Sequence, residues 1–134
     1  MAKLTDIEGV GPVYSQKLKS AGVSTTDALL KKGATAKGRQ ALADKSGISG
    51  KLILRWVNHA DLFRLDGVAG EYAELLEAAG VDTVPELAQR NAENLYQKLV
   101  EVNGAQKLVR VVPVQTQVGQ WVEQAKNLPR IVTH

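Results

Sequence analysis

Apolar residues recur every three or four positions through most of the chain, and this spacing predicts α-helices. The clearest stripe lies in residues 49–61 and consists of Leu52, Ile53, Trp56, Val57 and Ala60. The other stripes predict helices over residues 12–21, 24–32, 36–45 and 71–79, a short helix carrying Leu87, a helix that starts after Asn91, and a last helix that begins at Thr116 or Gln117. The fold class predicted from this pattern is all-α.

Residues with strong preferences at helix ends mark where these elements begin and stop. Pro12 suits a first helical turn, where its missing N–H costs least, and Thr35 and Asn91 are favourable N-caps. Glycine is predicted to end five helices, at Gly22, Gly33, Gly47, Gly80 and Gly104. Residues 108–115, rich in valine, are predicted to be extended, and residues 127–134 to be non-helical.

The chain repeats itself. Residues 7–25 reappear as residues 65–83, and ten positions are identical at an offset of 58: Gly9/Gly67, Val10/Val68, Tyr14/Tyr72, Leu18/Leu76, Ala21/Ala79, Gly22/Gly80, Val23/Val81, Thr25/Thr83, Leu29/Leu87 and Ala34/Ala92. The pattern Trp56-Val57-x-x-Ala60 recurs as Trp121-Val122-x-x-Ala125 at an offset of 65, so the second copy carries about seven more residues. We therefore expect two repeats, residues 1–62 and 63–134, fused into one compact domain with a shared core.

Each copy begins with a glycine-containing turn. The stretch Ile7-Glu8-Gly9-Val10-Gly11-Pro12, followed by a helix, resembles the helix-hairpin-helix motif of DNA repair, replication and recombination proteins. The resemblance is carried by Ile7, Gly9, Val10, Gly11, Pro12, Leu18, Ala21, Gly22 and Val23. The longer pattern, with a Trp-Val-x-x-Ala helix closing each copy, is similar to a bacterial family of tandem helix-hairpin-helix domains, DUF4332. The role of that family is largely undefined, whereas the resemblance to the helix-hairpin-helix motif implies paired hairpins and contacts to the phosphate backbone of DNA.

The physics of such a turn accounts for phosphate binding. A helix N-terminus has unpaired N–H groups and a partial positive charge. Gly9 and Gly11 are expected to allow a positive φ and to leave no side chain between backbone and phosphate, while Val10 points inward. The candidate nucleic-acid-binding residues are Gly9, Val10, Gly11, Val13, Tyr14, Lys17 and Lys19. Contacts of this kind hold the phosphate backbone and carry no base information.

Two departures from the motif bear on this hypothesis. Repair-type hairpins often place lysine directly after the proline, where this chain has Val13, so Lys17 and Lys19 are expected to substitute in part. The second copy has Ala69 in place of Gly11. It is also surrounded by acids that would repel phosphate, namely Asp66, Glu71, Glu74 and Glu77. We therefore expect the second copy to be a structural partner of the first.

Charge is segregated along the chain. Residues 1–58 carry ten basic and four acidic residues, residues 59–104 carry three basic and nine acidic residues, and residues 105–134 carry four basic and one acidic residue. Possible accessory contacts to a polyanion are Lys31, Lys32, Lys37 and Arg39. The leading hypothesis is sequence-independent binding of nucleic acid, DNA rather than RNA. The alternative is a protein-interaction or self-assembly module in which the basic copy meets an acidic partner or the acidic copy of a second molecule.

Each candidate residue also has a purely structural interpretation. The Gly9–Gly11 turn could serve only to join two helices, and the lysines could form an ordinary solvated face. Because Tyr14 and Tyr72 recur at one position, packing is favoured over base stacking for them. Trp56 and Trp121 lie on apolar stripes, which favours core positions.

Several functional classes are excluded or disfavoured. The chain has no cysteine, which rules out disulfides and thiolate chemistry. His59 and His134 have no neighbours at metal-ligand spacing, and we find no nucleophile or phosphate-loop motif, so neither enzymatic activity nor a cofactor is expected. No signal sequence or membrane span is apparent, and we expect a cytoplasmic protein without membrane contact.

Overall fold

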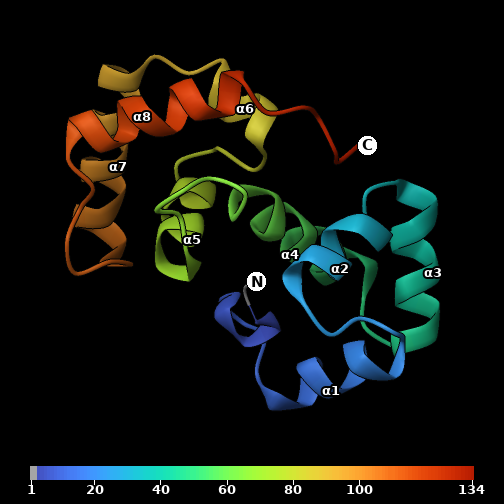
Figure 1. Cartoon of the computed structure of the whole chain (residues 1–134). Helices are drawn as coiled ribbons and strands as arrows, with labels where there is room; N and C mark the ends of the chain where they lie inside the picture. The colour runs from blue at the N-terminus through green and yellow to red at the C-terminus, as the bar shows by residue number, and fades with distance from the viewer. Residues whose placement is uncertain (1–2) are drawn as a thin grey trace. The chain divides into compact units, whose positions relative to one another are not determined.

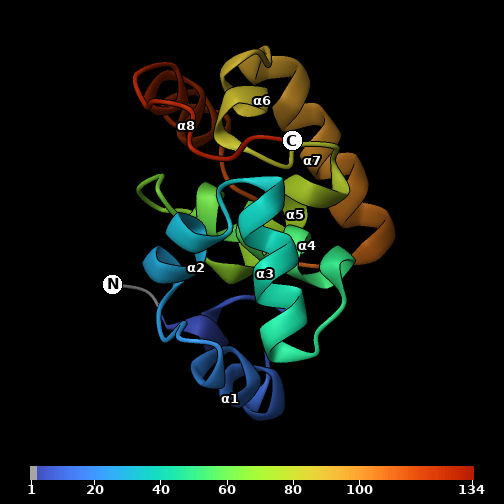
Figure 2. The same cartoon turned by 90° about the vertical axis from the view of Figure 1, so that its right-hand side faces the viewer.

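The computed structural model describes residues 3–134, and Figures 1 and 2 show its helices in two views. Within this described range the regular elements are eight α-helices and one short 3-10 helix, with no strand, so the predicted all-α class is confirmed. The chain divides into two compact units, and each has its own set of four α-helices.

The first unit extends to Asp61 and also includes Ile131–His134. Its elements are the 3-10 helix η1 (Leu4–Asp6), α1 (Pro12–Ser20), α2 (Thr26–Lys32), α3 (Ala36–Ser46) and α4 (Gly50–Leu62), whose last residue falls in the second unit. Helix α3 packs against α1 and α2, and η1 packs against α1. Gly33, between α2 and α3, lies so close to Val57 of α4 that a Cβ on Gly33 would overlap the valine side chain.

The second unit comprises Leu62–Arg130. Its helices are α5 (Gly70–Ala78), α6 (Val84–Ala88), α7 (Ala92–Gln106) and α8 (Gln115–Lys126). Helix α8 packs against α6 and α7, and α5 packs against α7. The buried core between them is aliphatic except for Trp121.

Side-chain caps fix the starts of three helices. Thr35 and Asn91 are the predicted caps, whereas Thr25 caps α2, which begins at Thr26 and not at the predicted residue 24. The hydroxyl of Thr25 accepts a hydrogen bond from the N–H of Ala28 at 3.1 Å, and the hydroxyl of Thr35 accepts one from Gly38 at 3.0 Å. The side chain of Asn91 caps α7 in the same way. Each bond satisfies an N–H that has no partner within the helix.

The predicted end of α7 at Gly104 is wrong, because the helix continues to Gln106 and stops at Lys107, which takes the left-handed conformation with φ 53°. The cause lies in a tertiary contact. The side chain of Asn103 binds both backbone groups of Val109, donating to its carbonyl at 3.1 Å and accepting from its N–H at 2.9 Å. These two bonds fix where the chain turns after α7, two residues beyond Gly104. The preference of glycine for helix ends does not predict this position.

The two tryptophans occupy closely similar settings. Trp56 and Trp121 are each 1% exposed. The ring of Tyr14 lies 5.0 Å from that of Trp56, and the ring of Tyr72 lies 5.5 Å from that of Trp121. The predicted core positions of both tryptophans are therefore confirmed.

The C-proximal segment Ile131–His134 belongs to the first unit, although the expected boundary at residues 62/63 grouped it with the second repeat. The N–H of Thr133 donates to the carbonyl of Ala34 at 2.8 Å. The guanidinium of Arg39 donates to the carbonyls of Gly33, Ala34 and Thr133 at 2.9, 3.1 and 2.8 Å. The two bonds that involve Thr133 join residues far apart in sequence, so local pattern could not reveal them. A core shared by both repeats stays a prediction.

Truncation of either indole should be costly because each fills a closed core. We expect Trp56→Ala to lower the free energy of unfolding by about 3–5 kcal/mol, from lost transfer energy and the cavity left behind. Urea unfolding followed by circular dichroism measures the change. A cost below about 1 kcal/mol, the size typical of an average substitution, would contradict the packing of the indole described above.

Removal of the Arg39 guanidinium should take away the donor that the carbonyls of Gly33 and Thr133 share. We expect Arg39→Met, which keeps the apolar stem, to cost about 1–3 kcal/mol and to accelerate hydrogen exchange at the Thr133 amide. The matched control is Lys37→Met on the exposed side of α3, expected to stay within about 0.5 kcal/mol of the parent. Unchanged exchange at Thr133 in Arg39→Met would show that the guanidinium does not hold the segment.

Candidate nucleic-acid interface

The turn before α1 is built on one glycine in an unusual conformation. Gly9 has φ +90°, which side chains of L-residues rarely tolerate. The next residue, Val10, donates its N–H to the carbonyl of Ile7 at 3.1 Å, and both apolar side chains are buried. The buried pair anchors the turn, and the expectation that Val10 points inward is confirmed.

Gly11 has a different role from the one expected. Its φ of −91° and ψ of −171° are extended values that any residue adopts, so the expected positive φ is wrong for this glycine. Ala69, at the matching place before α5, takes a similar conformation with φ −124° and ψ −172°. A Cβ built on Gly11 meets no atom within 4 Å. Glycine at position 11 therefore keeps the surface beside the helix N-terminus open. The backbone conformation does not require it.

The N-terminus of α1 has N–H donors without a partner inside the helix. Gly11 is the N-cap residue and supplies no side-chain cap, and Pro12 at the first helical position has no N–H. The first intrahelical bond runs from the N–H of Ser15 to the carbonyl of Gly11 at 2.9 Å. The N–H groups of Val13 and Tyr14 consequently have no partner within the helix.

The first turns of α1 bring three predicted residues together. The side chain of Val13 is 69% exposed and lies beside the open helix end. Tyr14 is half-buried because its ring packs against Trp56, which favours the packing role. The ammonium group of Lys17 lies 5.8 Å from the centre of the Tyr14 ring, within the range of a cation–π contact.

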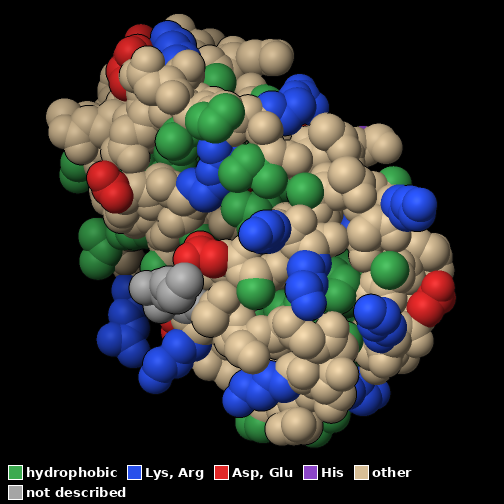
Figure 3. Space-filling model, turned by 45° about the vertical axis from the view of Figure 1, so that its right-hand side comes forward, with side chains coloured by type: hydrophobic (Ala, Val, Ile, Leu, Met, Phe, Trp, Pro, Cys, Tyr) green, Lys and Arg blue, Asp and Glu red, His purple; other side chains and the backbone are tan. Residues whose placement is uncertain are grey.

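The remaining predicted lysines are exposed, and one of them has a structural bond. Lys19 lies in the last turn of α1, and Lys31 and Lys37 lie on α2 and α3. The ammonium of Lys32 donates to the carbonyl of Gly22 at 3.0 Å, just beyond the C-terminus of α1, and lines a hollow of about 210 Å³ with Lys45. Figure 3 shows lysine and arginine side chains spread over the face that it displays, with acidic side chains fewer between them.

Arg39 is not part of this exposed basic surface. Its side chain is buried, and its guanidinium holds the three carbonyls described above. Burial lowers the pKa of the guanidinium from its ordinary value, because desolvation disfavours the charged form. The structure thus separates Arg39 from Lys31 and Lys37, with which the sequence pattern groups it.

The turn before α5 has the same backbone and opposite chemistry. Gly67 has φ +87°, and Val68 after it is buried. Asp66 and Glu71 are exposed beside this turn. The backbone of Asp66 is occupied on both sides, because its N–H donates to the side chain of Gln124 at 2.9 Å and its carbonyl accepts from the indole of Trp121 at 3.1 Å.

The acids further along α5 are less exposed than expected. Glu74 and Glu77 are half-buried, whereas the spacing of the three α5 glutamates is typical of a solvated helix face. Their carboxylates still make this helix unfavourable for an anion. In the described part of the chain, no group of three side chains could hold a metal ion, and no helix is both long and apolar enough to cross a membrane.

Sequence reasoning missed a groove in the second unit. Its volume is about 790 Å³, and it lies between the start of α7 and one face of α8. The one signal in the sequence is Gly119, a glycine inside the helical stripe that carries Val118 and Trp121. Glycine destabilises a helix interior, so its presence there suggests that neighbouring residues or a ligand require a position without a side chain.

Comparison with known proteins places the chain in a family. No match was found among the curated proteins or among the solved structures with which it was compared. A family model described as "Domain of unknown function (DUF4332)" matches residues 8–128, and this range includes both glycine turns and both tryptophans. The match extends over most of the chain, as the sequence resemblance implies, and the chain therefore belongs to the DUF4332 family.

Proposed function

We propose that this protein binds nucleic acid without sequence preference, by holding a backbone phosphate at the N-terminus of α1. The observation that carries the proposal is the open helix end: Gly11 provides no cap and no Cβ, and the N–H groups of Val13 and Tyr14 have no partner within the helix. Donors of this kind, at the positive end of a helix dipole, suit a phosphate oxygen.

The charges around the turn support a polyanionic ligand. Lys17 and Lys19 are exposed on α1, and Lys31 and Lys37 add positive charge to the same unit. Lysine contacts of this type release counterions from the nucleic acid, so affinity should fall as salt rises. The resemblance to helix-hairpin-helix motifs of DNA repair proteins favours DNA over RNA as the ligand.

Only the first turn is proposed to bind. The turn before α5 shares the backbone geometry but has Ala69 as its N-cap and the exposed acids Asp66 and Glu71 beside it. A phosphate at this place would meet like charge, and repulsion would oppose binding. We infer that the second copy supports the fold while the first contacts the ligand.

An aspartate at the helix end should weaken binding when it is placed in the first unit and not when it is placed in the second. We expect Gly11→Asp to weaken binding of a fluorescent DNA duplex by at least about tenfold, because a carboxylate takes the place of the phosphate. Aspartate is a favourable N-cap and meets no neighbour here, so the fold should persist. The control is Ala69→Asp, an exposed N-cap with a similar extended conformation, which should leave affinity unchanged. Equal effects of the two variants in anisotropy titrations would rule out a special role for the first turn.

Charge reversal on α1 should act through salt dependence. We expect Lys17→Glu to weaken binding of all duplex sequences alike and to reduce the slope of log affinity against log salt by about 1. Lys98→Glu in the second unit changes net charge equally and should have a much smaller effect. Titrations with duplex, single-stranded DNA and RNA at several salt concentrations test this prediction. No binding by the parent protein at low salt would reject the proposal and favour the protein-interaction module instead.

A further inference from the structure

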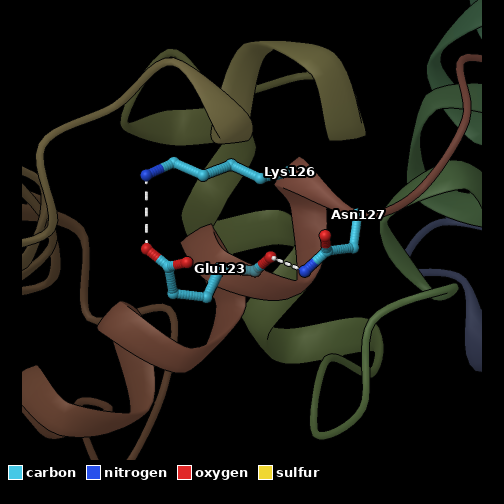
Figure 4. A network of polar contacts seen from close by, with 3 residues as sticks. All are labelled: Glu123, Lys126 and Asn127. Atoms are coloured by element: carbon cyan, nitrogen blue, oxygen red, sulfur yellow. Dashed lines mark hydrogen bonds and ion pairs between the residues drawn. The ribbon is translucent and has the colours of Figure 1, made fainter.

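The groove of about 790 Å³ in the second unit takes no part in the proposed phosphate site. One wall consists of the loop before α7 and its first residue, namely Arg90, Asn91 and Ala92. The other wall is the face of α8 that carries Gly119. Glu123 and Lys126 lie along the same face of α8, and Figure 4 shows the ion pair between them at 3.2 Å. The lining of the groove therefore combines the small residues Ala92 and Gly119 with polar and charged groups.

Position 119 adds no side chain to the lining of the groove. Gly119 lies inside α8, and a Cβ there would meet only the Cβ of Ala92, at an ordinary contact distance of 3.9 Å. Neither backbone conformation nor crowding requires glycine, although glycine destabilises a helix. At the corresponding place of α4, 65 residues earlier, the first unit has Leu54, whose side chain is half-buried. The missing side chain is thus specific to the second unit.

In the first unit, the loop before α3 corresponds to the loop before α7, and it has a bound segment beside it. Ala34 comes directly before the N-cap of α3, as Arg90 comes directly before the N-cap of α7. The non-helical segment Ile131–His134 lies along this loop, with Val132 buried and the N–H of Thr133 bound to the carbonyl of Ala34. A loop of this kind, in this protein, accepts the main chain of a non-helical segment.

We propose that the groove of the second unit binds an extended, acidic peptide segment of a partner protein. An apolar residue of the peptide would cover Gly119 and Ala92, and its main chain would bond to the loop before α7. A carboxylate would face Arg90, for which no ion pair is recorded within the described residues, and Lys126, whose side chain is 53% exposed despite its pairing with Glu123. The protein's own segment is not the occupant, because Arg39 and Ala34 hold it in the first unit.

The test uses a synthetic peptide on the full chain. The probe is acetyl-Glu-Ile-Val-Thr-Glu-amide, which combines the apolar and threonine residues of the bound segment with two carboxylates. We expect it to shift the amide NMR signals of Arg90, Ala92 and Gly119 in a saturable manner. Gly119→Leu, which places a side chain in the groove, should weaken binding by at least about tenfold, and Arg90→Glu should weaken it without any change in packing. The matched control is Gly104→Leu on α7, where a Cβ meets nothing and binding should be unchanged.

Three outcomes would overturn the proposal. Equal binding of acetyl-Lys-Ile-Val-Thr-Lys-amide would remove the role of Arg90 and Lys126. Shifts confined to Ala34 and Thr133 would show that the peptide displaces the protein's own segment instead. Concentration-dependent dimers that Gly119→Leu abolishes, without peptide binding, would identify the groove as a contact between copies. Because the groove lies in the second unit and the phosphate site on α1, each proposal can fail while the other stands.

Discussion

Both glycine turns depend on an indole. The Nε1 atom of Trp56 lies 3.7 Å from the place of a Cβ on Gly9, and that of Trp121 lies 3.4 Å from the place of a Cβ on Gly67. Because each tryptophan belongs to the helix that closes its unit, the indole connects the last helix of the unit to its first turn. Tyr14 and Tyr72 pack on the same rings and fix the following helix. In each unit, the glycine turn and the helix after it therefore pack against the same indole of the last helix. In the first unit this packing positions the N-terminus of α1.

Local chemistry made much of this fold predictable from sequence. Thr35 and Asn91 cap their helices as predicted, because the capping bond needs only residues three positions apart. The core positions of Trp56 and Trp121 followed from helical periodicity. Arg39 escaped prediction because its partner Thr133 lies 94 residues away, so a buried clamp looked like one more surface base. The groove could not be predicted for a similar reason. Gly119 of α8 indicates a groove only once the structure shows that Ala92 of α7 lies opposite it.

The two turns illustrate how one backbone can carry opposite surfaces. The positive φ of Gly9 and Gly67 and the buried Val10 and Val68 set the shape in both units. The exposed positions around them are free to differ, because surface charges change stability little. Basic residues outnumber acidic ones in residues 1–58, whereas Asp66 and Glu71 lie beside the second turn, so two turns of similar backbone are surrounded by opposite charge.

The return of Ile131–Thr133 to the first unit has a consequence for synthesis. During translation, helices α1 to α4 emerge well before the residue whose carbonyl completes the coordination of Arg39. Domains usually fold in order as they leave the ribosome, yet here the N-proximal unit must wait for residue 133 before its last buried donors are satisfied. Until then the Nη2 group of Arg39 lacks its partner carbonyl on Thr133, although the carbonyls of Gly33 and Ala34 are already within reach of Nη1. The first unit is therefore translated first but forms its last hydrogen bond only after the whole second unit has been translated.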